Sequence, residues 1–309
     1  MRVALSGLVF VFVHSASIAH ACMLVADKPI AVAGEEVLLV WDQEAQSEQL
    51  IRYIDFRGEA RDFGFVVPTP SKPSIRTLRS RSVFETLSGL YRRSSRGLKG
   101  VAEGSGVVGR EKSIGGVEVV SRVSLPAAGQ TATILAADDA GALYRWLSEH
   151  GYPSNPRLEA YYQPYVERGF FFTAFRYIKG ADRRTRGAVV SLSFKTEQLF
   201  FPYAEPRGNK PSRPFRLSVL AKEPVSAQLG AKPWGAKIGF RGPISTHIKY
   251  QFVSVMEARL PGDRWFVTTF DEPRSRRGGV DLVFSHAPET KPVAGSLKTI
   301  IGARADYVN

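Results

Sequence analysis

The sequence predicts an α+β fold of mostly antiparallel sheets, with a few helices in the first two thirds and a β-rich C-terminal part. Short runs rich in β-branched and aromatic residues recur along the chain, separated by Gly, Pro or polar breaks. The convincing helical patterns all fall in the first two thirds of the chain. The 309 residues are 44% hydrophobic and 23% charged, which excludes collagen-like, coiled-coil and wholly disordered chains.

Residues 1–21 have the layout of a secretory signal peptide. A positive start precedes an apolar run from Val3 to Val13, and Ala19 and Ala21 are the small residues that signal peptidase requires. This run is shorter than the roughly 20 residues that a helix needs to span a bilayer, so we expect cleavage after Ala21 rather than a retained anchor. No later run reaches about 18 apolar residues, so the mature chain has no predicted membrane span.

Cys22, the first mature residue, is the only cysteine in the chain. We therefore expect no intramolecular disulfide and no four-thiolate metal site. A cysteine at the cut site raises a second possibility, bacterial lipoprotein processing, in which lipid is attached to that thiol. Ala19 stands where such sites usually carry Leu, so simple cleavage is favoured and lipidation of Cys22 is the alternative. An exported chain without disulfides fits a bacterial envelope, in the periplasm or at the cell surface.

The opening strands are predicted at Glu36–Trp41, Leu50–Phe56 and Phe63–Val67. The sheet should end at the Pro68–Pro70 turn, because proline cannot donate a ladder hydrogen bond. Ser82 and Glu85 match a capping box, which predicts a helix that starts at Ser82. Residues 92–116 combine basic residues and glycines with little to bury, which predicts a mobile basic loop.

The middle of the chain predicts two strands, 117–123 and 131–136, followed by two helices. The first helix begins at Asp138, which can cap it, while Asp139 favours the positive end of the helix dipole. Gly151 supplies its left-handed stop. The second helix is expected to start near Asn155-Pro156 and to be ended by Pro164 and Gly169.

The remaining elements are predicted to be strands. The polar, Pro-rich residues 207–214 suggest a boundary or long loop, which gives residues 1–21 as signal peptide, 22–206 as an α+β domain and 207–309 as a β-rich part. That last part either stands alone or forms one domain with the preceding segment. The strands are expected at Phe170–Ile178, Ala188–Phe194, Leu199–Tyr203, Phe215–Leu220, Val225–Leu229, Ala236–Phe240, Ile248–Met256, Trp265–Phe270 and Val280–Phe284.

Three stretches together resemble DUF2330, a bacterial family of unknown function: Asp62–Pro70, Ala137–Tyr152 and Tyr165–Phe171. A later stretch, Asp281–Phe284, is similar to the closing segment of the family. The likeness covers roughly residues 22–287. The resemblance implies an exported protein and brings no activity, substrate or catalytic residue. The family commonly begins its mature part with a cysteine pair, whereas this chain has only one cysteine.

No motif for nucleophilic or metal catalysis is found in the sequence. Gly104-Ser105-Gly106 resembles a hydrolase elbow only within a flexible loop. Adjacent acids at Asp138 and Asp139 fit helix-start positions better than a catalytic pair. The three histidines of the mature chain lie far apart without paired spacing. We therefore assign no catalytic, cofactor or metal residues; an enzyme of unfamiliar type, with a site beside the Pro68–Pro70 turn and the Asp138 helix, is the alternative.

The charge balance is the remaining functional clue. The chain has 42 Lys and Arg against 29 Asp and Glu, a net charge of +13 that becomes +12 once the signal peptide is removed. Basic residues cluster in predicted loops without interleaved aromatics, and export separates the protein from nucleic acid, so nucleic acid is not the expected partner. The candidate surface contacts are Arg92, Arg93, Arg96, Lys99, Arg183, Arg184, Arg186, Arg274, Arg276 and Arg277.

Anionic lipid or polymer of the envelope is the natural partner for such charge. Solvated loops that keep the protein soluble are the equally open alternative. The sequence therefore predicts an exported, non-catalytic binding or structural module without a cofactor, whose basic loops face an anionic surface.

Overall fold

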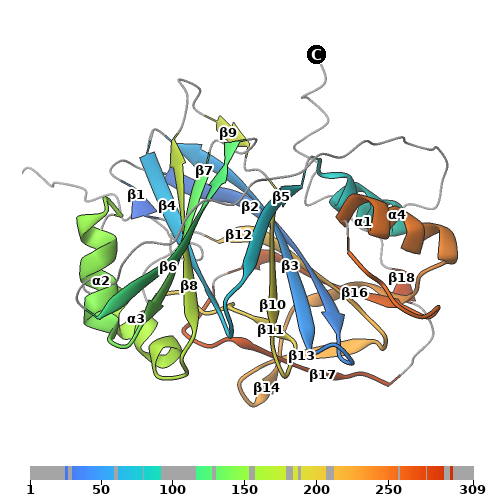
Figure 1. Ribbon diagram of the computed structural model, residues 1–309. Coiled ribbons are helices and arrows are strands. Elements are labelled where there is room, and N and C mark those ends of the chain that lie inside the picture. Colours follow the sequence, from blue (N-terminus) through green and yellow to red (C-terminus); the bar gives the residue numbers. More distant parts are fainter. Residues whose placement is uncertain are drawn as a thin grey trace, which may run out of the picture.

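The computed structural model confirms the α+β class, with three sheets dominated by antiparallel pairs and four helices in the part of the chain that it describes (Figure 1). The predicted signal peptide, Cys22 and almost all of the predicted basic loop lie outside that part. The described residues are 25–26, 30–58, 62–78, 80–91, 116–126, 130–152, 157–178, 184–186, 189–206, 212–256, 258–275, 277–288 and 293–294.

The largest sheet has nine strands and runs through the middle of the molecule. Its pairs are antiparallel except β12 with β2, which run parallel. In spatial order the strands are β18 (Val293–Ala294), β15 (Lys237–Pro243), β16 (Phe266–Ser275), β12 (Arg213–Ala221), β2 (Ile30–Asp42), β3 (Ser47–Gly58), β10 (Val189–Lys195) and β5 (Ser74–Leu78), and β9 (Arg184–Arg186) pairs with the end of β3.

A five-stranded antiparallel sheet packs against one face of the large sheet, and a four-stranded sheet lies at its lower end in Figure 1. The five-stranded sheet has the order β1 (Val25–Ala26), β4 (Asp62–Thr69), β8 (Phe171–Ile178), β7 (Gln130–Ala137) and β6 (Val117–Leu125). The four-stranded sheet has the order β11 (Phe200–Phe201), β17 (Leu282–His286), β13 (Val225–Leu229) and β14 (Lys232–Pro233).

Strand β4 ends at Thr69, within the predicted Pro68–Pro70 turn, and includes Pro68, so it runs two residues beyond the predicted strand end at Val67. Pro68 pairs with Phe172 of β8. On the other side of β4, the short strand β1 pairs only with Gly64 and Phe63. At Pro68 that side of β4 is therefore an edge, where a missing N–H donor is tolerated.

The helices are α1 (Ser82–Tyr91), α2 (Ala140–Glu149), α3 (Arg157–Val166) and α4 (Thr246–Met256). The first three confirm sequence predictions. At the start of α1, however, Ser82 is already helical, and the oxygen that accepts its N–H is Ser80 Oγ, at 3.2 Å. Gly151 and Gly169 have φ angles of 77° and 69°, as left-handed residues that follow helix ends do.

Helix α4 overturns the predicted strand Ile248–Met256 and the expectation of a C-terminal part without helices. Phe252 and Met256, four residues apart, are fully buried, while Ile248 packs against the same cluster. This i, i+4, i+8 spacing is helical. The β-prone Ile, Phe and Val residues favoured a strand, but packing against the large sheet decides for a helix, because propensity is a weak prior.

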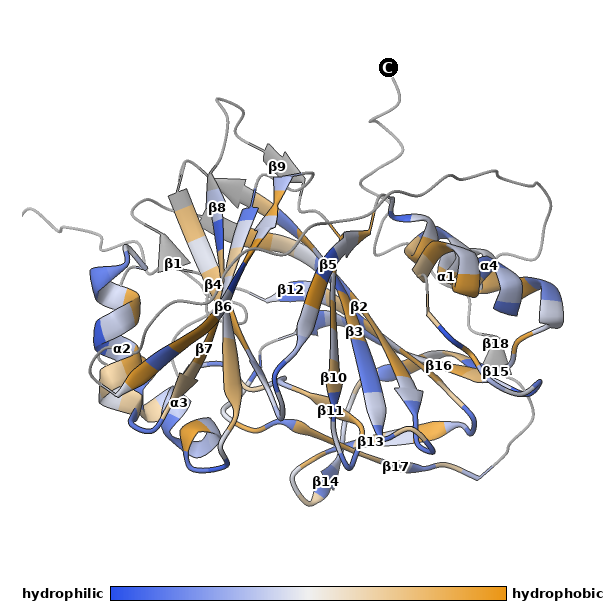
Figure 2. Ribbon diagram, viewed as in Figure 1, coloured by the Kyte–Doolittle hydropathy of each residue, from blue (hydrophilic) through white to orange (hydrophobic). Residues whose placement is uncertain are grey.

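The molecule has four layers: α2 and α3, the five-stranded sheet, the nine-stranded sheet, and then α1 and α4 (Figure 1). Along β2, Val37 and Leu39 belong to the cluster between the two sheets, whereas Leu38 and Val40 belong to the cluster under α1 and α4. A strand that is buried on both faces must lie in the interior. Figure 2 shows hydrophobic residues along the inner strands and mixed colours on the outer helices.

Strands from both sides of residue 207 share the nine-stranded sheet. The pair of β2 with β12 joins them at its centre, over six residue pairs from Glu35 with Phe215 to Val40 with Leu220. The cluster under α1 and α4 likewise combines Leu38 with Trp265. The C-terminal strands therefore complete the core of the preceding segment.

Candidate functional site

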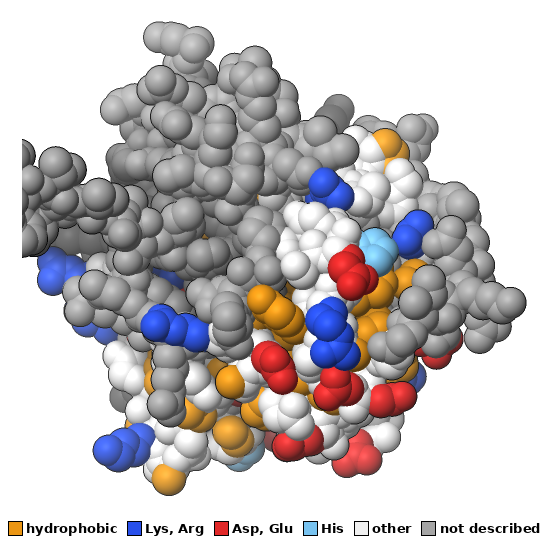
Figure 3. Space-filling view, turned by 90° about the vertical axis from the view of Figure 1, so that its left-hand side faces the viewer, with side chains coloured by type: hydrophobic (Ala, Val, Ile, Leu, Met, Phe, Trp, Pro, Cys, Tyr) orange, Lys and Arg blue, Asp and Glu red, His pale blue; other side chains and the backbone are white. Residues whose placement is uncertain are grey.

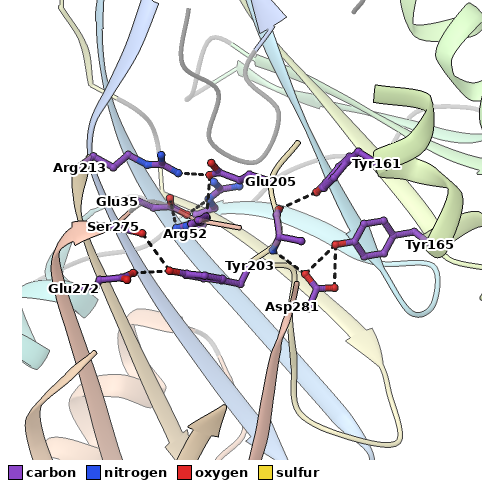
Figure 4. Close-up of polar contacts among 12 residues, drawn as sticks. Glu35, Arg52, Tyr161, Tyr165, Tyr203, Glu205, Arg213, Glu272, Ser275 and Asp281 are labelled. Carbon is purple, nitrogen blue, oxygen red and sulfur yellow. Dashed lines mark hydrogen bonds and ion pairs between the residues drawn. The ribbon is translucent and has the colours of Figure 1, made fainter. Parts of the chain in front are cut away.

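The most unusual polar feature is a buried cluster around residues 202–206, which we call the strap. The strap joins β11 to the chain before β12 and has no regular secondary structure, yet Tyr203, Ala204 and Glu205 are all buried. A buried backbone without strand partners must satisfy its polar groups in other ways. Figure 4 shows side chains from several elements that converge on it.

Five charged side chains form the centre of the cluster, and each is at most 5% exposed. Arg277 lies between two carboxylates, 2.6 Å from Glu35 and 3.6 Å from Glu205. Glu35 also accepts a hydrogen bond from Arg52 at 2.8 Å, and Glu205 accepts one from Arg213. Carboxylates buried this deeply persist as ions only where cations face them.

The arginines determine the ionisation of Glu35. Burial by itself raises the pKa of this carboxyl, but the guanidinium groups of Arg277 and Arg52 outweigh burial and hold the pKa below its ordinary value of 4.5. The Arg277 guanidinium also lies over the ring of Phe215, 4.0 Å from the centroid. Glu35 is therefore ionised at neutral pH, and the cluster is held by charge as well as by hydrogen bonds.

The next residue, Glu36, points to the opposite face of β2 and has its own partners. Arg81, at the start of α1, contacts Glu36 at 2.6 Å and lies 3.8 Å from the ring centroid of Tyr53. Arg216 lies 3.8 Å from Glu36 and bonds Asp271 at 2.6 Å. Successive acids on one strand are thus neutralised on both faces.

Hydrogen bonds tie the strap to α3 and to the chain before β17 (Figure 4). The Tyr165 hydroxyl donates to Asp281, 2.9 Å from either carboxylate oxygen, and the Ala204 N–H donates to the same group at 2.8 Å. Burial raises the pKa of Asp281, and these hydrogen bonds oppose the shift. Tyr161 donates to the Ala204 carbonyl at 3.3 Å. The strap is therefore held on both sides of its peptide backbone.

The Tyr203 hydroxyl provides a further link by donating to Glu272 at 2.6 Å, with Ser275 Oγ at 3.3 Å. Burial raises the pKa of this phenol, and the bond to Glu272 raises it further. Tyr203 is accordingly a hydrogen-bond donor throughout the physiological pH range.

A small cavity between the two large sheets, lined by Arg52, Tyr177 and apolar residues, is about the size of one water molecule.

The geometry of this cluster favours a structural role. Its carboxylates face guanidinium, hydroxyl or N–H groups of the protein, and the five central charges are almost completely shielded from solvent. A catalytic group must reach a substrate. The cluster instead holds β2, β3, the strap, β12 and the chain after β16 in one arrangement.

Arg277 corrects one sequence expectation. It was expected in a loop that contacts an anionic surface, but it is 4% exposed and bound to Glu35 and Glu205. The signal that could have revealed this is the pair Glu35 and Glu36 within an otherwise apolar strand, because buried acids require buried cations. Arg274, three residues earlier, is exposed, but it lies in β16 rather than in a loop.

The other predicted surface contacts either lie in β9 or fall outside the described part of the chain. Arg184 and Arg186 form β9, which pairs with the end of β3. The predicted cleavage and lipidation positions, Ala19, Ala21 and Cys22, lie outside the described part of the chain. The remaining predicted contacts also lie outside it: Arg92, Arg93, Arg96, Lys99, Arg183 and Arg276.

The Pro68–Pro70 turn and the start of α2, which the sequence suggested as the site of an alternative enzyme, meet at one end of the five-stranded sheet. Thr69 pairs with Phe171, which pairs with Ala136, two residues before Asp138. Asp139 rather than Asp138 caps α2, because its side chain accepts the Ala142 N–H at 2.6 Å. Both acids are exposed, and Asp139 is engaged in the cap.

The histidines are separate in space as well as in sequence. His150 stacks on Trp146, His247 contacts Gln251, and His286 pairs with Glu223 at 2.9 Å. Within the described ranges no three His, Cys, Asp or Glu residues gather as a metal site would require. Nor is any helix among those residues long and apolar enough to cross a membrane.

The stretches that carry the family resemblance touch one another. A Cβ added at Gly64 would lie 2.6 Å from the ring of Tyr152 and from the carbonyl oxygen of Phe175, so only glycine fits there. Tyr165 and Asp281 join the third stretch to the closing one. Glycine and aromatic residues in these stretches thus have packing roles.

The chain matches a family model and is distantly similar to solved structures of a viral protein. No curated protein matches. The crystal structure of baculovirus P35 aligns with a TM-score of 0.39 and 9% identity over 84% of this chain and 98% of that one. A mutated baculovirus P35 after caspase cleavage aligns with a TM-score of 0.37 and 9% identity over 83% and 98%. Both structural likenesses are weak.

The family model described as "Uncharacterized protein conserved in bacteria (DUF2330)" matches residues 14–233. The match includes the first three resembling stretches and ends before the closing one at Asp281–Phe284. Because it spans well over half of the chain, the protein belongs to the DUF2330 family.

Proposed function

We propose that this protein is an exported component of the bacterial cell envelope, a non-catalytic binding or structural module whose basic loops contact an anionic lipid or polymer surface. It resides in the periplasm or at the cell surface, either free or anchored through a lipid on Cys22. Membership of a bacterial family and the signal-peptide layout of residues 1–21 support this proposal.

The main support for the proposal is that the first described strand, β1, and the basic residues of β9 lie at the same end of the fold. Strand β1 pairs with the start of β4, and Val25 is the third residue after Cys22, a reach of about 11 Å at most. Strand β9, with Arg184 and Arg186, pairs with the end of β3, directly before β4. Both lie in the upper part of Figure 1. An anchor at Cys22 would bring this cluster close to the bilayer.

The distribution of charge also supports the proposal. The charges of the interior are compensated by internal partners, as around Glu35 and Glu36. On the face formed by α2 and α3, acidic and basic side chains both occur (Figure 3). Most of the surplus positive charge belongs to residues outside the described ranges, such as Arg92 and Arg93. These segments are the ones available for an external anionic partner.

Co-sedimentation of the mature protein with vesicles tests the proposal. We expect binding to vesicles that contain phosphatidylglycerol, no binding to pure phosphatidylcholine, and weaker binding as salt increases. The double variant Arg184→Ser, Arg186→Ser should bind about 30-fold more weakly, because each basic residue near an anionic bilayer contributes roughly 1 kcal/mol.

The matched control removes the same charge at the other end of the molecule. Lys72, which follows the end of β4, and Lys232, in β14, are both exposed. The double variant Lys72→Ser, Lys232→Ser should bind almost as the wild type does. Equal losses in both double variants would show that net charge alone matters, and salt-independent absence of wild-type binding would refute the proposal. Mass spectrometry of the mature N-terminus, purified from the native envelope, distinguishes free Cys22 from lipidated Cys22.

A further inference from the structure

Glu48 is a fully buried acid that the polar cluster does not include. It lies at the start of β3, and the only hydrogen bond to its side chain from the described residues comes from the Phe200 N–H, 2.8 Å from Oε2. Its other oxygen, Oε1, is buried and has no partner among the described residues. The residues opposite Glu48 on the neighbouring strands, Trp41 and Phe194, belong to the hydrophobic core.

No counterion among the described residues offsets this burial. Asp42 and Lys195 lie opposite Ser47, so strand alternation places them on the other face of the sheet. Arg52 is bound to Glu35, and Asp281 to Tyr165. Burial raises the pKa of Glu48 well above its ordinary value of 4.5, and the Phe200 N–H only partly opposes it. The charged residues closest in register on the surrounding elements are Arg52 on β3, Asp42 on β2, Lys195 on β10, Glu197 before β11 and Asp281 before β17.

The partner of Glu48 is the strand that leads into the strap. Phe200 begins β11, and its ring meets Phe170 edge to face at 5.3 Å. Two residues later the strap starts, and Tyr203 continues the chain through a hydrogen bond from its N–H to the Phe201 carbonyl. A single side chain therefore links the core of the large sheet to the first turn of the strap.

We propose that Glu48 is a protonation-dependent latch, which holds β11 and the strap closed while it is a neutral acid and loosens them as its proton becomes easier to lose. In the closed state the carboxylic acid keeps its proton and accepts the Phe200 N–H. In a locally open state the carboxyl meets water, ionises with its ordinary pKa and passes its proton to solvent. Opening is therefore coupled to the release of one proton.

The coupling fixes the sign of the pH dependence. Below pH 4.5 both states keep the proton, and the latch is strongest. Above that value only the open state has lost its proton, so opening becomes up to tenfold more favourable for each pH unit until the closed state also ionises. An exported protein shares the pH of its surroundings more directly than a cytoplasmic one, so the strap would respond to external pH.

Hydrogen exchange of the full mature chain tests the latch. Protection factors, which correct for the pH dependence of intrinsic exchange, are measured between pH 5 and pH 8 for amides of residues 199–206. In the wild type they should fall by up to tenfold per pH unit, while amides of β2 change far less. In Glu48→Gln, which cannot ionise but keeps an acceptor oxygen, they should change far less with pH, because of the two buried carboxyls that bond β11 and the strap only Asp281 still titrates.

Glu197→Gln is the matched control, because it makes the same chemical change at an exposed position just before β11. It should behave as the wild type does. Equal pH slopes in the wild type and in Glu48→Gln, or a strap whose protection does not change with pH in the wild type, would overturn the proposal. Should Glu48→Gln fail to fold, the wild-type comparison between the strap and β2 still decides.

Discussion

Arg277 shows how far the role of a residue can depart from its local sequence. Its neighbours are arginine, serine and glycines, which predict a solvated loop. In the structure its guanidinium joins Glu35, 242 residues away, to Glu205. Replacing a buried ion pair completely can be neutral, but removing one member leaves the other charged and unpaired.

Arg277→Ala should lower the free energy of unfolding by about 3–5 kcal/mol, because Glu35 and Glu205 lose their shared cation while staying buried. Arg274→Ala, an exposed change three residues earlier, should alter it by less than about 0.5 kcal/mol. Urea unfolding followed by tryptophan fluorescence measures both. Similar values for the two variants would contradict the buried network.

At the scale of elements, the starts of α1, α2 and α3 were predicted to within two residues, whereas the capping residue of α2 was not. The two acids before α2 identified the helix correctly, but Asp139 is the capping residue rather than Asp138. Adjacent acids are equally good caps by composition, and the choice depends on which backbone position turns into the helix.

Asp139→Ala should cost about 1 kcal/mol in the free energy of unfolding, since the Ala142 N–H loses its acceptor. Asp138→Ala should cost clearly less, because no capping bond is lost. Thermal unfolding of the two variants, compared under one buffer condition, separates these outcomes. A larger loss in Asp138→Ala would assign the cap to that residue instead.

At the scale of the molecule, sequence distance is a poor guide to domain organisation. The Pro-rich residues 207–214 suggested a boundary, yet β12, directly after them, lies in the centre of the nine-stranded sheet between β2 and β16. Even the family match at residues 14–233 ends before α4 and β16, which complete the core.

A chain that ends at residue 233 should therefore fail to fold. It would leave β12 as an exposed edge and remove Phe252, Met256 and Trp265 from the cluster beneath α1. A chain that ends at residue 288 loses only β18 from the described strands and should stay folded. Circular dichroism and analytical gel filtration compare both with the full chain. A monomeric, cooperatively unfolding 1–233 fragment would refute this dependence.

Local sequence patterns were enough to predict the class of fold, most strands, three helices and the turn glycines Gly151 and Gly169, because propensity, periodicity and backbone conformation act within a few residues. The helix at Ile248–Met256, the burial of Arg277 and the unpartnered oxygen of Glu48 among the described residues became visible only in the folded chain. Each of these depends on what packs against the residue across a sheet. Burial changes the free energy of a charge or an apolar face by more than local preference does.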